Sequence, residues 1–312
     1  MNPVLTSGAS ASAPKWSLCT LDIAGLPVPC VEAEGGCYRL GPSLARAGLR
    51  GVESVAALFT DWPSALRALD SAVRCLLPED RVPAGRRLAP LLYPGKVLCA
   101  GANYFDHLAE MGMPGAKKAD QRLFFFMKPP RNAVVGEGPT VRMPIGTQAF
   151  DWEIELAAVI GRTARNVPVE TALDHVAAWT VAIDFSARDH NRAPETFYKL
   201  DWVAGKANDT CCPIGPRLVP AAAIADPQGI RLKLWVNGAL KQDGHSTDMI
   251  FTVAEQIATA SRIMTLDPGD LLLTGTPAGV GMPKGTFLKP GDIVEAEIEH
   301  IGRLTVTIQD PG

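Results

Sequence analysis

Residues 150 to 160 read Phe-Asp-Trp-Glu-Ile-Glu-Leu-Ala-Ala-Val-Ile, and residues 179 to 184, Trp-Thr-Val-Ala-Ile-Asp, end a second apolar run on a carboxylate. The alternation around Glu153 and Glu155 predicts a strand, in which residues i and i+2 project from one face, so both carboxylates would point into one cavity. Two adjacent anions among apolar residues resist desolvation. A divalent cation bound by this pair and Asp184 would make the arrangement tolerable, whereas the simpler alternative is a solvent-facing pair on an amphipathic strand. Oxygen ligands favour Mg²⁺, Mn²⁺ or Ca²⁺ over Zn²⁺.

The composition is that of a globular protein with a full hydrophobic core. The chain has 312 residues, of which 47% are hydrophobic and 20% charged, enough for one large domain with a smaller one or for two modest domains. Its net charge of −3 lacks the basic excess of a protein that binds nucleic acid or an anionic membrane surface. We therefore expect small neutral or anionic metabolites as partners.

The cysteines and the N-terminus bear on the cellular compartment. Seven cysteines follow no CxxC or Cys/His spacing, which indicates reduced thiols in a cytoplasmic protein. Residues 1 to 14 lack the basic and apolar regions of a signal peptide, and no apolar run approaches the roughly 18 residues that span a bilayer. We expect a disordered leader without a targeting role, and no membrane association.

Two regions that differ in their expected secondary structure follow the leader. Residues 15 to 90 predict a small α+β domain with no recognisable catalytic group, which would serve as a structural or dimer-forming appendage; a linker over 86 to 95 follows. Beyond it, short β-rich runs separated by Pro/Gly turns predict a large, mostly antiparallel sheet system. The clearest helix is expected over 253 to 264, with Thr252 as its N-cap. No GxGxxG, P-loop or GxSxG pattern is present.

Residues 101 to 110 predict a strand that turns into a helix, and this helix carries a candidate general base. His107 and Glu110 are three residues apart and so lie on one helical face, where the carboxylate can orient the imidazole and raise its basicity. Such a pair also occurs by chance on exposed helices. Residues 111 to 122, which are polar and rich in glycine, would form either a mobile lid or a surface loop.

Further candidates lie near turns. Lys128 would touch an anionic substrate group or be a charge at the edge of a turn. Arg188 and Lys206 are cations that could stabilise a developing negative charge. Gly275 and Thr276 belong to a glycine loop after a strand, which could bind a carboxylate or carbonyl oxygen or be a plain turn.

Taken in order, these segments resemble the fumarylacetoacetate hydrolase family. The resemblance covers residues 96 to 308 and rests on eight motifs in compatible order: NYFDHLAEMG (103 to 112), FFMKPP (125 to 130), DWEIELAAVIGR (151 to 162), DFSARD (184 to 189), GKANDTCCPIGP (205 to 216), VNG (236 to 238), STDMIF (246 to 251) and LDPGDLLLTGTPAGVG (266 to 281). It implies a mainly β fold with α+β additions, the family's mixed β-sandwich roll, over a catalytic domain at 95 to 310, and a homodimer.

The resemblance also implies the site residues. A Mg²⁺ or Mn²⁺ site falls on Glu153, Glu155 and Asp184, and a water-activating dyad falls on His107 and Glu110. The family's active-site lysine falls on Lys206 and its substrate contacts on Arg188 and Thr276. Further residues that we expect to bind substrate are Tyr104, Lys128, Asn191 and Gly275. At position 191 the family commonly has Gln, so the shorter Asn191 predicts a changed contact and a different preferred substrate.

The favoured hypothesis is a metal-dependent hydrolase that cleaves a carbon–carbon bond in an acylpyruvate or another β-dicarbonyl 2-oxo acid. His107 would take a proton from water, and cleavage would expel a metal-bound enolate that Lys206 stabilises. An isomerase, tautomerase or decarboxylase of 2-oxo dicarboxylates in aromatic catabolism is the close alternative, because these reactions share the enolate. A non-catalytic β-rich binding protein is the third hypothesis.

Overall fold

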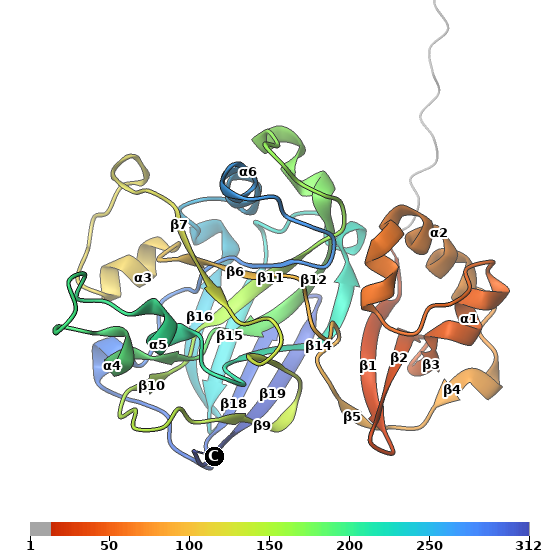
Figure 1. The fold of residues 1–312 in the computed structure, drawn as a ribbon, viewed down its shortest axis with the longest axis horizontal. Helices are drawn as coiled ribbons and strands as arrows, with labels where there is room; N and C mark the ends of the chain where they lie inside the picture. Colours follow the sequence, from red (N-terminus) through yellow and green to blue (C-terminus); the bar gives the residue numbers. More distant parts are fainter. Residues whose placement is uncertain (1–13, 312) are drawn as a thin grey trace, which may run out of the picture.

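The structure is a computed structural model that describes residues 14 to 311. Figure 1 shows a β-rich body and, at its right, a smaller α+β unit built by the N-terminal residues. Residues 1 to 13 of the predicted leader lie outside the described residues.

The body is a sandwich of two sheets. The main sheet contains, in spatial order, β14 (Cys212–Pro220), β12 (Val176–Ile183), β11 (Ile154–Ile160), β17 (Leu271–Leu273), β6 (Val97–Gly101) and β7 (Phe124–Lys128). The second sheet has five strands in the order β16 (Ala239–His245), β15 (Arg231–Val236), β18 (Ile293–Ile298), β19 (Gly302–Gln309) and β9 (Gly138–Arg142). Apolar side chains from both sheets form one buried cluster. This arrangement confirms the predicted mixed β-sandwich.

Strand β11 is buried on both faces, which explains why residues 156 to 160 are continuously apolar. Leu156, Ala158 and Ile160 belong to the cluster between the two sheets. Ala157 and Val159, on the opposite face, belong to a second cluster that the N-terminal unit completes. A strand buried on both faces cannot alternate between apolar and polar residues.

The N-terminal unit continues the main sheet. It contains β1 (Ser17–Ile23), β2 (Leu26–Ala33), β3 (Gly36–Arg39), α1 (Leu40–Arg46), the 3₁₀ helices η1 (Ala56–Asp61) and η2 (Pro78–Asp80), α2 (Trp62–Ala72), β4 (Arg81–Val82) and β5 (Arg86–Arg87). Strand β1 pairs with β14 at Leu18 and Leu218, and Leu69 of α2 shares a core cluster with Ala177 of β12. The division into domains near residue 90 stays a prediction.

The remaining elements are short, apart from one helix. They are α3 (Phe105–Glu110), η3 (Lys118–Asp120), β8 (Val134–Val135), β10 (Phe150–Asp151), η4 (Val169–His175), β13 (Ser186–Ala187), α4 (Arg188–Asn191), α5 (Trp202–Lys206), η5 (Ala221–Ala223), η6 (Ser246–Asp248) and η7 (Met282–Lys284). Helix α6 (Val253–Ile263) begins with a capping box formed by Thr252 and Glu255, as its N-cap residue predicts. Among residues 14 to 311, no helix has the length and apolar character needed to cross a membrane.

Two of the longer strands, β14 and β16, were not expected from the sequence. Pro213, Gly215 and Pro216 interrupt the pattern of β14, although this strand lies near the centre of the main sheet. Strand β16 follows the turn at Asn237 and Gly238, whose positive φ angles suit a tight hairpin, so the Asn-Gly pair was its signal. Most strand pairs are antiparallel, as predicted; the exceptions in the described chain are β17 with β6, β19 with β9 and β14 with β8.

Candidate active site

The three predicted metal ligands come together at one end of the main sheet. Glu153 directly precedes β11 and Asp184 directly follows β12, and the antiparallel pairing of Ile154 with Ile183 places these ends side by side. Glu155 lies in β11, two residues beyond Glu153. One carboxylate oxygen of each acid lies within 4.8 Å of the others, and all three side chains are buried. The solvent-facing alternative is therefore wrong.

Three cations surround these acids. Lys206 Nζ lies 2.6 Å from Glu153 Oε2 and 2.6 Å from Asp184 Oδ2. Lys128 Nζ lies 2.6 Å from Asp184 Oδ1. Arg188 binds Glu153 through Nη2 at 2.5 Å and Asp151 through Nε at 2.9 Å.

The charges in this cluster do not balance. Among residues 14 to 311, the four carboxylates of Asp151, Glu153, Glu155 and Asp184 form ion pairs only with the three cations just described. Glu155 has no cation bonded to it; its Oε2 accepts a hydrogen bond of 2.6 Å from the backbone N–H of Gly275.

The ionisation of the acids follows from this imbalance. Burial, together with the negative charges of Asp184 and Glu153, raises the pKa of Glu155 well above its usual range. Burial alone would also raise the pKa of Glu153, but Arg188, Lys206 and His107 hold it below its usual range.

The donor set fits a hard divalent cation. It consists only of carboxylate oxygens, and Asp184 Oδ1 is buried without a hydrogen bond even though an ammonium lies near it. An added positive charge would allow Glu155 to ionise and would remove the excess of negative charge. Glu153, Glu155 and Asp184 are therefore the residues that could hold the ion.

The predicted dyad is formed and is held in place from outside the helix. His107 Nδ1 lies 2.8 Å from Glu110 Oε1 on α3. The other oxygen, Glu110 Oε2, accepts a hydrogen bond of 2.8 Å from the backbone N–H of Gly279. Because the carboxylate is fixed by a second contact, it fixes the imidazole in turn. The glycine loop thus orients the dyad.

Two predicted residues of the glycine loop support the acids. Gly275 has a φ of +95°, and a Cβ there would lie 2.7 Å from Asn103 Cβ, so the position requires glycine. Thr276 Oγ1 donates to the carbonyl of Ile154 and accepts from Gln242 Nε2, both at 2.8 Å. Their hydrogen-bonding groups are engaged with the protein.

A cavity of about 240 Å³ adjoins the acids and the dyad. Seven of the predicted residues line it: His107, Glu153, Glu155, Arg188, Asn191, Lys206 and Thr276. The rest of its wall is largely apolar and includes Leu108, Met111, Phe124, Phe126 and Trp202. Carboxylate oxygens, an imidazole and an apolar wall therefore share one cavity, as is typical of a small-molecule site.

The other predicted substrate contacts lie outside the lining of this cavity. Tyr104 is fully buried, and its hydroxyl has no hydrogen-bond partner. Lys128 is also buried. It donates a hydrogen bond of 3.0 Å to the carbonyl of Phe185 and forms an ion pair with Asp184. The turn-edge position proposed for Lys128 is wrong, and in this structure neither Lys128 nor Tyr104 is placed to touch a ligand in the cavity.

Sequence reasoning missed several residues that build the site. Asp151 accepts hydrogen bonds from Arg188 and from the backbone N–H of Gly281, and its place beside the Glu153 motif was a usable signal. Gln242 Oε1 accepts from the backbone N–H of Ile154, but nothing around position 242 in the sequence marks it. The Trp202 ring stacks on Phe126 with 5.4 Å between centroids and lines the cavity, and its place four residues before Lys206 was a usable signal.

Comparisons with known proteins agree with this architecture. The family described as Fumarylacetoacetate (FAA) hydrolase C-terminal matches residues 96–309. Oxaloacetate tautomerase fahd2, mitochondrial, from Xenopus laevis is 41% identical over 70% of this chain and 66% of its own length. The present chain thus spans slightly under two thirds of that relative.

Two solved structures are also similar. Fumarylacetoacetate hydrolase from Exiguobacterium antarcticum has a TM-score of 0.75 and 31% identity, over 95% of this chain and 99% of its own. Fumarylpyruvate hydrolase from Pseudomonas aeruginosa, in complex with Mn²⁺ and pyruvate, has a TM-score of 0.63 and 33% identity, over 72% of this chain and 92% of its own. This chain belongs to the fumarylacetoacetate hydrolase family.

Proposed function

We propose that this protein is a divalent-metal-dependent enzyme that interconverts the keto and enol forms of a small 2-oxo acid. The observation that carries the proposal is that His107, held by Glu110, lines the same cavity as Glu153 and Glu155. The name of the Xenopus relative, an oxaloacetate tautomerase, supports proton transfer as the reaction. The sequence alone favoured hydrolysis over tautomerisation, and the name of this relative reverses that preference.

Each group of residues has its own role in the proposed reaction. Glu153, Glu155 and Asp184 would hold Mg²⁺ or Mn²⁺, and the ion would supply the Lewis-acid chemistry that favours an enolate. His107 would take a proton from the carbon beside the carbonyl and deliver it to the carbonyl oxygen, or the reverse, with Glu110 stabilising the imidazolium. Lys206 would offset the negative charge that develops on the substrate.

Hydrolysis of an acylpyruvate is the second candidate. Phe124, Phe126 and Trp202 give the cavity an apolar wall that suits an acyl group better than a second carboxylate. The cations in the lining, Arg188 and Lys206, are both engaged with the acids. In this reaction His107 would take its proton from water instead of carbon, and decarboxylation would be a side path of the same site.

A substrate panel separates the candidates. The metal-stripped protein would be supplied with Mg²⁺ or Mn²⁺ and then with enol-oxaloacetate or acetylpyruvate. Faster formation of keto-oxaloacetate, trapped by malate dehydrogenase and NADH, would support the tautomerase. Release of pyruvate from acetylpyruvate would support the hydrolase, and release from oxaloacetate the decarboxylase. No metal-dependent turnover of any of them would contradict both candidates and favour the binding-protein hypothesis.

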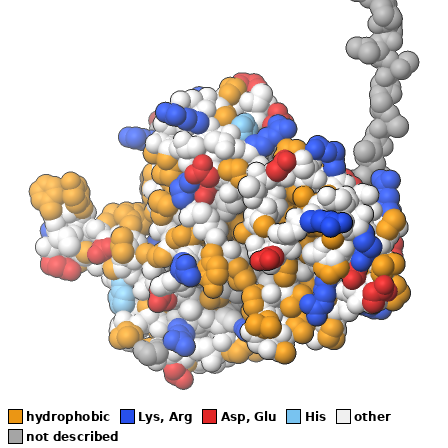
Figure 2. Space-filling view, turned by 45° about the vertical axis from the view of Figure 1, so that its right-hand side comes forward, with side chains coloured by type: hydrophobic (Ala, Val, Ile, Leu, Met, Phe, Trp, Pro, Cys, Tyr) orange, Lys and Arg blue, Asp and Glu red, His pale blue; other side chains and the backbone are white. Residues whose placement is uncertain are grey.

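We also propose a homodimer. The segment between α4 and α5 extends from the left of the body in Figure 1, and Figure 2 has a projection on the same side whose tip is covered by hydrophobic side chains. In this segment Phe197 and Tyr198 are 89% and 82% exposed. Adjacent aromatic side chains at such exposure are suited to a protein interface. A cytoplasmic location stays a prediction.

A further inference from the structure

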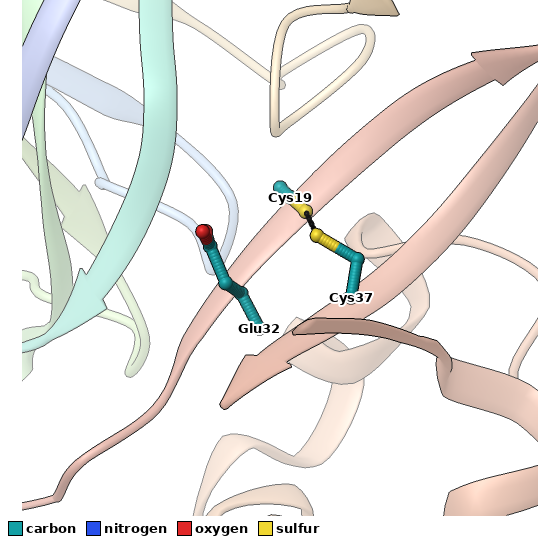
Figure 3. Close-up of side chains that lie close together, drawn as sticks. All are labelled: Cys19, Glu32 and Cys37. Carbon is teal, nitrogen blue, oxygen red and sulfur yellow. Dashed lines mark hydrogen bonds between the residues drawn. The ribbon is translucent and has the colours of Figure 1, made fainter. Parts of the chain in front are cut away.

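The N-terminal unit carries a second cluster of metal-ligating side chains, far from the acids in the sequence. Cys19 lies on β1, Glu32 on β2 and Cys37 on β3, and the pairings Cys19 with Cys30 and Glu32 with Cys37 place all of them on one face of the sheet. The sulfurs of Cys19 and Cys37 are 3.8 Å apart. One carboxylate oxygen of Glu32 lies within 4.8 Å of both (Figure 3).

We infer that Cys19, Cys37 and Glu32 form a binding site for a thiophilic divalent cation of the Zn²⁺ type. Two sulfurs bound to Zn²⁺ at about 2.3 Å with tetrahedral angles are about 3.8 Å apart, which is the separation found between Cys19 and Cys37. Two thiolates and one carboxylate form a donor set that Zn²⁺ accepts. The softer ligands distinguish this site from the oxygen-only site of the catalytic cavity.

The charge around the cluster supports the assignment. A divalent cation with two thiolates and a carboxylate carries one net negative charge. Arg87 offsets it, because its Nη2 lies 2.9 Å from Glu32 Oε1 and its Nη1 lies 3.3 Å from Oε2. The guanidinium also holds the Glu32 carboxylate in one orientation, as groups that hydrogen-bond to metal ligands do.

A fourth coordination position is open to water. Glu32 and Cys37 line a cavity of about 330 Å³, together with Arg81 and Arg87. A bound cation would displace the thiol protons of Cys19 and Cys37, as is usual for thiolate ligands.

A Cys19–Cys37 disulfide fits the fold less well. Strands β1 and β3 both pair with β2, so the backbones of the two cysteines are separated by two strand spacings. In a flat sheet two strand spacings amount to roughly 10 Å, whereas a disulfide requires Cα atoms within about 7 Å. Closing the bond would require β2 to be displaced, whereas a metal ion spans the gap between the sulfurs as they stand.

Cobalt substitution tests the inference on the full chain. The reduced, chelator-treated protein would be titrated with Co²⁺, which gives a sulfur-to-metal charge-transfer band only with thiolate ligands. We expect a band that saturates at one equivalent, is lost in Cys19→Ser and Cys37→Ser, and requires at least about tenfold more Co²⁺ in Glu32→Gln. Cys75→Ser, which removes an exposed cysteine outside the cluster, should leave the band unchanged.

The catalytic site serves as an independent reference. Glu153→Gln should retain the thiolate band and lose metal-dependent turnover. Cys37→Ser should lose the band and retain turnover. Failure of one site is therefore distinguishable from failure of the other. If a cysteine variant does not fold, alkylation of wild type decides. Zn²⁺ should protect the partly exposed Cys37 from a thiol reagent while the exposed Cys75 continues to react.

Three results would overturn the inference. The first is the absence of a charge-transfer band in reduced wild type. The second is a band that persists in folded Cys37→Ser. The third is equal alkylation of Cys37 with and without Zn²⁺. A Cys19–Cys37 disulfide, found by peptide mapping after mild oxidation, would give this result because Cys37 is then alkylated in neither case.

Discussion

Lys206 Nζ lies 2.6 Å from Asp184 Oδ2, and both side chains are buried. The same ammonium contacts Glu153 at 2.6 Å, so it bridges two of the three proposed metal ligands. A divalent cation bound by these acids would have to share their oxygens with Lys206 or displace it. The lysine is therefore placed both to weaken metal binding and to sit beside any substrate bound to the metal.

Replacing Lys206 should separate these two effects. In Lys206→Met the acids lose a competing cation, so the Kd for Mn²⁺ should fall. Turnover should fall by about 10²-fold or more, since a charge positioned near the reacting oxygen is lost. Calorimetric titration with Mn²⁺ and steady-state kinetics measure the two quantities. Lys289→Met, at an exposed position, is the matched control, and unchanged Kd and turnover in Lys206→Met would remove the lysine from the proposed mechanism.

His107 and Glu110 should differ in the size of their effects. His107→Gln removes the proposed base, so turnover should fall by about 10²-fold or more while Mn²⁺ still binds. Glu110→Gln can still accept the hydrogen bond from Gly279 but loses its charge, so the loss should be smaller. Stopped-flow measurement of enol-to-keto conversion in both variants tests the order. Full activity in His107→Gln would transfer the role of base to another residue.

One part of the predicted site is encoded by local periodicity. Glu153 and Glu155 follow from the two-residue repeat of a strand, and His107 and Glu110 follow from the three-residue spacing of a helix. Asp184 required one further step, the pairing of β11 with β12, which two consecutive apolar runs suggest. These residues depend on contacts between neighbours in sequence or between adjacent strands.

The parts that sequence reasoning missed depend on long-range contacts. Lys128 was expected to touch the substrate but instead contacts Asp184 from β7, at the far edge of the main sheet path, and no local pattern encodes that contact. Gln242 reaches Ile154 from the second sheet. The Cys19 and Cys37 sulfurs meet across β2, so a search for short cysteine spacings could not find them.

The stability of the metal-free protein should depend on Glu155. Its folded pKa is raised above the unfolded value of about 4.3, so its contribution to stability is fully present below that value and is lost as pH rises through the folded pKa. Urea unfolding of metal-free protein between pH 5 and 8 should therefore give a free energy of unfolding that falls with pH.

Two comparisons isolate this effect. Glu155→Gln cannot ionise and should flatten the slope, although the pKa of Asp151, which burial also raises, contributes in the same direction. Saturating Mn²⁺ should flatten the slope as well, because the ion favours the charged carboxylate. The depressed pKa of Glu153 acts in the opposite sense, with stability lost as pH falls, but only at pH values below this window. An identical slope in wild type and Glu155→Gln would contradict the assignment.

The exposed aromatic pair should control the oligomeric state. The Phe197 and Tyr198 rings contact each other at 5.1 Å between centroids and have few other neighbours at 89% and 82% exposure. If they form the interface, the double variant Phe197→Ser/Tyr198→Ser should be monomeric in sedimentation velocity while wild type is a dimer. Leu26→Ser, a 68% exposed position on the N-terminal unit, should leave the dimer intact. Monomeric wild type would refute the homodimer.

Residues 111 to 122 should become ordered when the site is filled. Gly112 and Gly115 adopt positive φ angles, and the segment contacts the body through an ion pair between Lys118 and Glu255 at 2.7 Å. Both partners are partly exposed, so the pair contributes only about 0 to 1 kcal/mol. Met111, at the start of the segment, lines the catalytic cavity, so a bound ligand can reach the segment directly.

Hydrogen exchange tests this lid. With Mg²⁺ and oxalate, an enolate mimic, amides of residues 111 to 122 should exchange more slowly than in the free protein, because closure adds contacts to a weakly held segment. Lys118→Ala should exchange faster than wild type without ligand and should still be protected with it. The turn over residues 225 to 229, which does not line the catalytic cavity, is the internal control and should not change. Equal exchange of residues 111 to 122 with and without saturating ligand would identify the segment as an ordinary surface loop, and the exclusion of water from the enolate would then have to come from the apolar wall of the cavity alone.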